Sequence, residues 1–126
     1  MISSVALAVC LVLAALAVFQ LLLISGAPLG RFAWGGQHTV LPARLRVGSA
    51  VSVLLYGLFA LIVLERAGLS ALFTDERVGR IGTWVLVGYL SLGVLMNAVS
   101  RSKPERYLMT PVALLLAGLC LLVARA

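Results

Sequence analysis

Charge is distributed along this chain in a way that leaves few folds open to it. The ten Lys and Arg residues and the four Asp and Glu residues all lie outside four long apolar runs, which cover residues 2–24, 47–64, 81–99 and 108–124. A charged side chain near the centre of a bilayer costs about 3 kcal/mol even on a lenient scale, so runs without charge are typical of membrane spans. The pattern predicts an all-α, polytopic membrane protein.

The lengths of the runs and the composition agree with this fold. At about 1.5 Å per residue the runs are about 34, 27, 28 and 25 Å long, and the hydrocarbon core of a bilayer is about 30 Å thick. Hydrophobic residues make up 63% of the chain and charged residues 11%, against roughly 45–50% and 25% in soluble domains. We predict a single domain, residues 1–126, that forms a four-transmembrane-helix bundle.

A cleaved secretory signal is the alternative interpretation of the first run. Ser25-Gly26-Ala27 supplies the small residues that cleavage requires. However, no Lys or Arg precedes the run, and the run is longer than the apolar region of a signal, which is about 7–15 residues. We therefore expect an uncleaved first span.

Lys and Arg determine the expected orientation, because acidic residues contribute little to topology. The first and third connections carry six basic residues and the opposite side carries four, so we expect the first and third connections to be cytoplasmic. The net charge of +6 is thinly spread and has no aromatic interleaving, which argues against nucleic acid as a partner. Contact with the lipid bilayer and its anionic headgroups is the ordinary explanation. The six residues are Arg31, Arg44, Arg46, Arg101, Lys103 and Arg106.

The first connection is long and contains no acidic residue. It holds four Gly, two Pro, the only His and three Arg between residues 26 and 46, whereas two to eight residues are usual between neighbouring helices. Phe32 and Trp34 suit the headgroup layer. Two interpretations are open: an interfacial loop whose arginines only orient the protein, or a site for an anion such as a lipid phosphate. The candidate ligands from this connection are Arg31, Gln37, His38, Arg44 and Arg46.

Two amide side chains lie within the spans, Gln20 near the end of the first and Asn97 near the corresponding end of the third. In lipid an amide needs a hydrogen-bond partner, and such residues often join neighbouring helices. The alternative is that Gln20 and Asn97 line a polar pocket at the cytoplasmic end. Ser100, Arg101 and Arg106 follow Asn97 and complete the candidate ligand-binding set.

Other residues predict packing or helix ends. Gly48 with Ser52 has the small-xxx-small spacing that allows two helices to approach closely, and Gly68 suits a helix end. Residues 69–73 have one-face helical spacing, which predicts a short surface helix before Thr74-Asp-Glu-Arg77. Residues 102–106 resemble a helix start, and Pro111 either kinks the fourth helix or marks its true start.

The sequence gives little support to catalysis, metal or redox chemistry. Cys10 and Cys120 lie within spans and form no CxxC motif. We expect both cysteines to pack as small apolar side chains, and a disulfide between them is the alternative if their helices touch. No cluster of metal ligands is present in the pattern, and His38 has no evident acidic partner nearby in sequence. We expect no cofactor, no metal and no enzymatic activity.

Eight short blocks, spread over most of the chain, carry a resemblance to a known group of proteins. Taken together they resemble a family of small four-span bacterial membrane proteins that is common in actinobacteria. The resemblance implies a bacterial plasma membrane location and supplies no activity, ligand or catalytic residue. The blocks are Gly35-Gly-Gln-His38, Leu41-Pro42, Arg44-Leu-Arg46, Gly48-Ser-Ala50, Met96-Asn97, Ser100-Arg-Ser102, Glu105-Arg106 and Pro111-Val112.

These observations lead to two functional hypotheses. The first is a non-enzymatic accessory protein, or a protein that binds a small ligand or lipid at the cytoplasmic face. The second is a small transporter or channel subunit that forms its pathway as a homo-oligomer or in a larger membrane complex.

Overall fold

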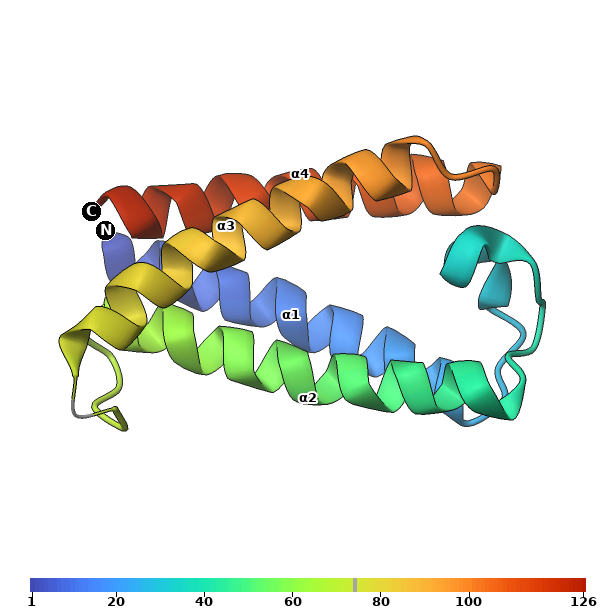
Figure 1. Cartoon of the computed structure of the whole chain (residues 1–126), viewed down its shortest axis with the longest axis horizontal. Helices are drawn as coiled ribbons and strands as arrows, with labels where there is room; N and C mark the ends of the chain where they lie inside the picture. The colour runs from blue at the N-terminus through green and yellow to red at the C-terminus, as the bar shows by residue number, and fades with distance from the viewer. Residues whose placement is uncertain (74) are drawn as a thin grey trace.

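The computed structural model describes residues 1–73 and 75–126 and contains four long helices (Figure 1). All four are long and apolar enough to cross a membrane, and no strand occurs among the described residues. The predicted all-α, four-helix membrane fold is therefore confirmed. The helices are α1 (Ile2–Ile24), α2 (Ala43–Arg66), α3 (Glu76–Ala98) and α4 (Lys103–Arg125), and two short 3-10 turns, η1 (Gly30–Phe32) and η2 (Trp34–Gly36), lie in the first connection.

Three helices extend beyond the apolar runs into charged flanks. The α2 helix begins at Ala43 and ends at Arg66, whereas its apolar run covers only residues 47–64. Hydropathy marks the part of a helix that lipid surrounds, but backbone hydrogen bonding continues into the headgroup layer, where long basic side chains reach water. The helices are consequently more uniform in length than the apolar runs.

The helix ends follow the local chemistry of their capping residues. The Asp75 carboxylate accepts a hydrogen bond from the Arg77 backbone N–H at 2.9 Å, at the start of α3. Ser102 caps α4 in the same way and accepts from the Glu105 backbone N–H at 3.5 Å, so the predicted start of the fourth helix is confirmed. Gly68 adopts φ +78° after α2 and confirms the predicted helix end.

Two predictions about the helix boundaries need correction. Residues 69–73 form no surface helix, because the Glu65 carboxylate accepts hydrogen bonds from the Ser70 hydroxyl (2.9 Å) and from the backbone N–H groups of Leu72 and Phe73. Thr74, in the segment expected to follow that helix, lies outside the described residues. Pro111 lies inside a continuous α4 and does not mark its start.

Consecutive helices pack as neighbours, and α4 returns to pack against α1. The chain ends lie side by side at one end of the bundle, and the first and third connections lie together at the other (Figure 1). The α1–α2 pair and the α3–α4 pair separate toward the latter end, where the first connection contacts α4. The bundle is thus closed at one end and covered by a loop at the other.

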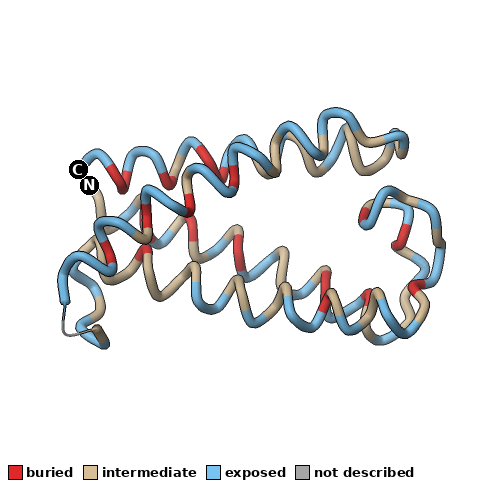
Figure 2. Tube along the Cα trace, in the orientation of Figure 1, coloured by how far each residue is buried: buried red, intermediate tan, exposed pale blue. Residues whose placement is uncertain are grey.

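Burial follows the same asymmetry (Figure 2). One apolar core joins α1, α2, α3 and α4 and includes Val9, Val63, Leu86 and Val123. A second, smaller core of Leu23, Ala33 and Leu41 lies beneath the first connection. Cys120 is fully buried and Cys10 half-buried, and both are free thiols, as expected for small apolar residues.

Candidate functional site

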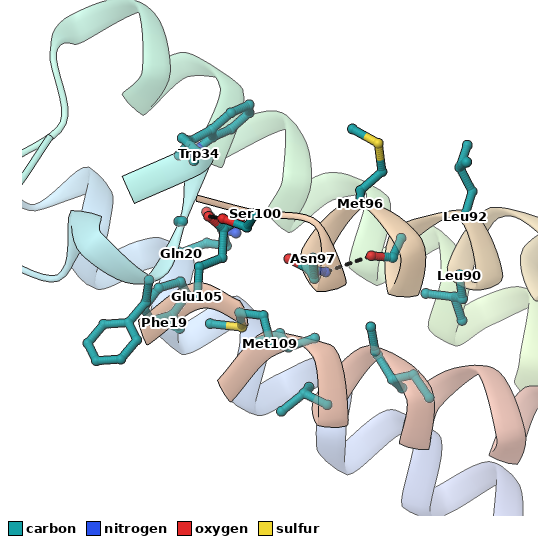
Figure 3. A pocket seen from close by; sticks show the side chains of 18 of the residues that line it. Phe19, Gln20, Trp34, Leu90, Leu92, Met96, Asn97, Ser100, Glu105 and Met109 are labelled. Atoms are coloured by element: carbon teal, nitrogen blue, oxygen red, sulfur yellow. Dashed lines mark hydrogen bonds between the residues drawn. The ribbon is translucent and has the colours of Figure 1, made fainter. Parts of the chain in front are cut away.

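A cavity of about 650 Å³ lies between the helices at the end covered by the first connection (Figure 3). All four helices and the first connection contribute to its wall. Leu90 and Leu116 line its deep end and belong also to the main core. The cavity therefore occupies the space that the diverging helix pairs leave between them.

Aromatic side chains are concentrated in the cavity wall. Six of the nine Phe, Trp and Tyr residues of the chain line it. The Phe59 ring lies 6.4 Å from the Tyr56 ring and 5.5 Å from the Tyr89 ring, both in tilted arrangements that aromatic pairs prefer. The six are Phe19, Phe32, Trp34, Tyr56, Phe59 and Tyr89.

Gln20 is the buried polar residue of this wall. Only 8% of it is exposed, and its Nε2 donates a hydrogen bond to the Tyr56 hydroxyl at 3.4 Å, which joins α1 to α2. Its Oε1 atom is buried and has no partner among the described residues. A buried amide within a membrane span is costly unless it is hydrogen-bonded, so this contact joins α1 to α2 beside the cavity.

Asn97 contributes to the same wall without joining two helices. Its Nδ2 donates to the Gly93 carbonyl of its own helix at 2.8 Å. The prediction that Gln20 and Asn97 both hold helices together is thus right for Gln20 and wrong for Asn97. Both residues line the cavity, but its wall is mainly aromatic and aliphatic, so the pocket is less polar than the alternative predicted.

The outer part of the cavity carries charges of both signs. Arg101 and Glu105 line it, together with Gln37 and Ser100. The Ser100 hydroxyl donates to the Glu105 carboxylate at 2.9 Å (Figure 3). One basic and one acidic side chain give the charged part of the wall no net charge.

The first connection is fixed over the cavity by contacts at two points. The Trp34 indole N–H donates to the Ser49 hydroxyl of α2 at 3.2 Å, and Trp34 adopts φ +53°, which is uncommon for a bulky residue. On the other side, the Ser102 hydroxyl donates to the Arg31 carbonyl, which connects the loop to α4. A Cβ on Gly36 would stand 2.4 Å from the Ser102 side chain, so a close approach requires glycine here.

Gly48 has a role other than the one predicted. A Cβ on Gly48 would lie 2.7 Å from the Trp34 ring, so the small residue accommodates an indole from the first connection and not a neighbouring helix. Phe32 and Trp34, for which we expect a place in the headgroup layer, both line the cavity. The loop folds inward because Ala33 and Leu41 bury their side chains against Leu23.

The predicted ligand-binding residues divide into two equal groups. Gln20, Gln37, Asn97, Ser100 and Arg101 line the cavity. The others lie outside its wall: Arg31 lies over the Phe32 ring at 5.1 Å, Arg46 donates to the Leu41 carbonyl at 2.9 Å, and Arg106 lies over the Tyr107 ring at 5.0 Å. Arg44 and His38 complete this second group. Arg31 and Arg46 thus contact residues of the first connection itself.

Sequence reasoning missed most of the wall. Tyr56, Phe59 and Tyr89 lie in apolar runs, where an aromatic residue is unremarkable, and only the packing of α2 against α3 brings them together. For Glu105 the sequence indicates only a place at a helix start, whereas the residue also lines the cavity. No group of three or more His, Cys, Asp or Glu side chains that could hold a metal occurs in the described part of the chain.

Fold and site together define a class: a four-span membrane protein with an aromatic cavity beneath an ordered loop. Comparison with known proteins adds no closer assignment, because no family model, no curated protein and no solved structure matches the chain.

Proposed function

We propose that this protein binds a small, largely apolar molecule in the cavity between its four helices, in a non-enzymatic role. The observation that carries the proposal is the cavity, with a volume of about 650 Å³ and a wall of mainly aromatic and aliphatic side chains. Small-molecule pockets typically measure roughly 300–1,000 Å³ and combine apolar walls with a few polar groups that fix orientation. Gln20 and Asn97 are such polar groups.

The packing of the opposite end favours binding over transport. Beyond Leu90 and Leu116 the space between the helices is filled by fully buried side chains, among them Ala6, Val9 and Val123. A solute path would require polar groups or space through this core, whereas a binding site requires only the covered end. A transporter or channel subunit that acts as an oligomer is therefore our second hypothesis.

We place the protein in a bacterial plasma membrane with the cavity end toward the cytoplasm. The resemblance described above is the support for the bacterial location, and the excess of Lys and Arg at that end, six of ten, is the support for the orientation. In a protein with Ala at both native cysteines, Gln37→Cys in the first connection and Leu69→Cys in the second mark opposite ends of the α2 helix. A membrane-impermeant maleimide applied to intact cells should label only the Leu69→Cys protein, and labelling of Gln37→Cys alone would reverse the orientation.

Binding is tested through Trp34, which lines the cavity, in a protein where Trp84 is replaced by Phe. The probe is an octylbenzene brominated near the end of its chain, added to the protein in lipid nanodiscs. We expect saturable quenching of Trp34 fluorescence, beyond the linear quenching that membrane partitioning produces. A Trp34→Phe protein keeps the lipid-exposed Trp84 and measures partitioning alone.

A cavity-filling variant provides the matched control. Ala113 lines the cavity and Ala14 is exposed on the outside of α1. Ala113→Phe should abolish saturable quenching, and Ala14→Phe should leave it unchanged. If no saturable component exists in the starting protein, or if both variants retain it, the cavity is not a binding site.

A further inference from the structure

The cavity opens sideways, toward the lipid that surrounds the spans. Tyr89, Leu92 and Met96 line the cavity, yet they are 55%, 58% and 65% exposed. A side chain that lines a cavity and also meets the surroundings stands at an opening between the two. All three belong to α3, which is long and apolar enough to span a membrane, and Leu92 and Met96 project from one side of it (Figure 3). A membrane lipid can therefore reach the cavity without passing through water.

The wall changes from apolar to polar along the cavity. Leu90 and Leu116 line the deep end, whereas Arg101 and Glu105 line the outer end. Asn97 follows Leu90 by seven residues in α3, which is about 10 Å of helix at ~1.5 Å per residue. One leaflet contributes roughly 15 Å of hydrocarbon, half of a core about 30 Å thick. The cavity thus has the polarity of one leaflet and the depth to take the outer part of one acyl chain.

Glu105 is placed in the wall by a departure from the usual helix start. It follows Ser102 by three residues, the spacing of a capping box, in which the Glu carboxylate accepts from the backbone N–H of the capping Ser. Here the Ser102 N–H donates to the Ser100 hydroxyl at 3.2 Å, and Glu105 accepts from that hydroxyl at 2.9 Å. Glu105 forms no ion pair among the described residues, although six basic residues and no other acidic residue lie at this end of the bundle. Its carboxylate is therefore available to a cation in the cavity.

Arg101 supplies the opposite charge at the same end of the cavity. It is exposed and forms no ion pair within the described part of the chain. A guanidinium suits a phosphate group, which accepts two of its N–H groups at once, and a carboxylate suits an ammonium group, which only donates. A purely anionic headgroup would leave Glu105 unmatched and bring like charges together. A headgroup with one charge of each sign matches both side chains.

We propose that the occupant of this cavity is a membrane phospholipid with a zwitterionic headgroup that ends in a primary ammonium, the chemistry of phosphatidylethanolamine. One acyl chain enters through the lateral opening beside Leu92 and Met96, and the second chain stays in the bilayer. The phosphate meets Arg101 and the ammonium donates to Glu105. This inference rests on the proposed binding function and names the ligand class of the same site.

The test measures which lipid quenches Trp34, which lines the cavity, in the Trp84→Phe protein. The protein is reconstituted in phosphatidylcholine vesicles that contain one test lipid, brominated near the carbonyl end of one chain. The test lipids carry ethanolamine, choline or glycerol headgroups on identical chains. The Ala113→Phe protein, whose cavity is filled, measures quenching by lipid outside the cavity. We expect the ethanolamine lipid to bind about fivefold more tightly than the other two, since a choline group has no N–H and a glycerol headgroup leaves the lipid anionic.

Variants at the outer end of the cavity assign the headgroup contacts. Glu105→Gln should bring the ethanolamine and choline lipids to within about twofold of each other, because the charge that attracts the ammonium is lost. Arg101→Gln should weaken the binding of all three phospholipids by about fivefold. Lys103→Gln is the matched control, because Lys103 is a neighbouring basic residue outside the cavity wall, and it should leave each affinity unchanged.

A soluble competitor distinguishes the lipid from its headgroup. Glycerophosphoethanolamine carries the same headgroup without acyl chains, and we expect it not to relieve the quenching by the ethanolamine lipid. Relief of quenching would show that the headgroup alone is the ligand and would overturn the assignment to a membrane lipid.

The remaining outcomes separate this inference from the proposed function. Equal binding of the three headgroups would overturn the headgroup assignment and leave apolar binding in the cavity intact, and tighter binding of the glycerol lipid would overturn the pairing of both charges. Quenching by every lipid no stronger than in Ala113→Phe would overturn a lipid occupant, whereas the proposed function fails only if the brominated octylbenzene also shows no saturable quenching. The headgroup comparison uses the unaltered cavity, so it decides the matter even if a variant fails to fold.

Discussion

The contact between Trp34 and Gly48 yields the sharpest prediction about the loop that covers the cavity. In Gly48→Ala the new Cβ would stand 2.7 Å from Cη2 and 2.8 Å from Cζ2 of the Trp34 ring. Ordinary carbon contacts are about 3.5–4.0 Å, so the ring must retreat by about 1 Å. Because the same indole donates to the Ser49 hydroxyl at 3.2 Å, its displacement also breaks that hydrogen bond.

Two costs determine the size of the change. Overpacking costs about 1–3 kcal/mol and the lost hydrogen bond about 1 kcal/mol. The helix preference of alanine over glycine does not offset them, because α2 is helical whether or not the loop is docked. We therefore expect Gly48→Ala to destabilise the docked loop by about 2–4 kcal/mol, roughly a factor of 30 to 900 in the docking equilibrium.

Gly57 provides the matched control on the same helix, because a Cβ there meets nothing within 4 Å. Gly57→Ala gains only the helix preference, about 1 kcal/mol, and should raise the thermal midpoint. Both variants are made in the Trp84→Phe background, and Trp34 fluorescence and its quenching by acrylamide report whether the loop is docked. We expect a red shift and stronger quenching only in Gly48→Ala. Identical emission and quenching in the two variants would refute the argument.

Three further predictions concern the loop and the helix ends. Gly30→Ala should release the first connection, measured by faster proteolysis of the loop, since its Cβ would lie 1.9 Å from the His38 carbonyl oxygen; unchanged cleavage would contradict this close approach. Ser102→Ala removes the N-cap of α4 and the hydrogen bond to the Arg31 carbonyl, and it should lower stability by about 2 kcal/mol in thermal unfolding, whereas Ser102→Asp should restore only the cap, because a carboxylate cannot donate to that carbonyl. Hydrogen bonds from Arg77 lower the pKa of Asp75 below its usual range, so the α3 cap is fully present above about pH 4 and is lost as pH falls through the lowered pKa. Hydrogen exchange at the start of α3 should rise in that acidic window in the native protein but not in Asp75→Asn, and equal pH profiles would refute the linkage.

The helices could be predicted because their signals are local. An uninterrupted apolar run about as long as a bilayer is thick has one stable conformation in lipid, since only a helix satisfies every backbone group within its own segment. The capping residues Ser102 and Gly68 act within one turn of their helices. The expected surface helix at residues 69–73 failed because the Glu65 carboxylate takes the amide groups of that segment, a contact that hydrophobic spacing does not reveal.

The candidate site could be predicted only in part. Gln20 and Asn97 stand out because an amide is rare and costly within a span, and both line the cavity. The arginines of the first connection stood out equally, yet Arg31 and Arg46 contact residues of that same loop. The sequence shows that an arginine stands in an otherwise apolar or acid-free segment. It does not show whether the guanidinium contacts a ligand or a neighbouring carbonyl.

The sequence by itself determined that this protein has four membrane-spanning helices and roughly where each one lies, because bilayer thickness, charge and capping act on residues close in the chain. Only the tertiary structure decided that the two helix pairs separate at one end, that Trp34 docks on Gly48 and that Tyr56 presents its hydroxyl to Gln20. The physical reason is that a cavity is a property of packing: its wall joins residues from five segments of the chain, and each segment taken alone is only an apolar helix or a glycine-rich loop.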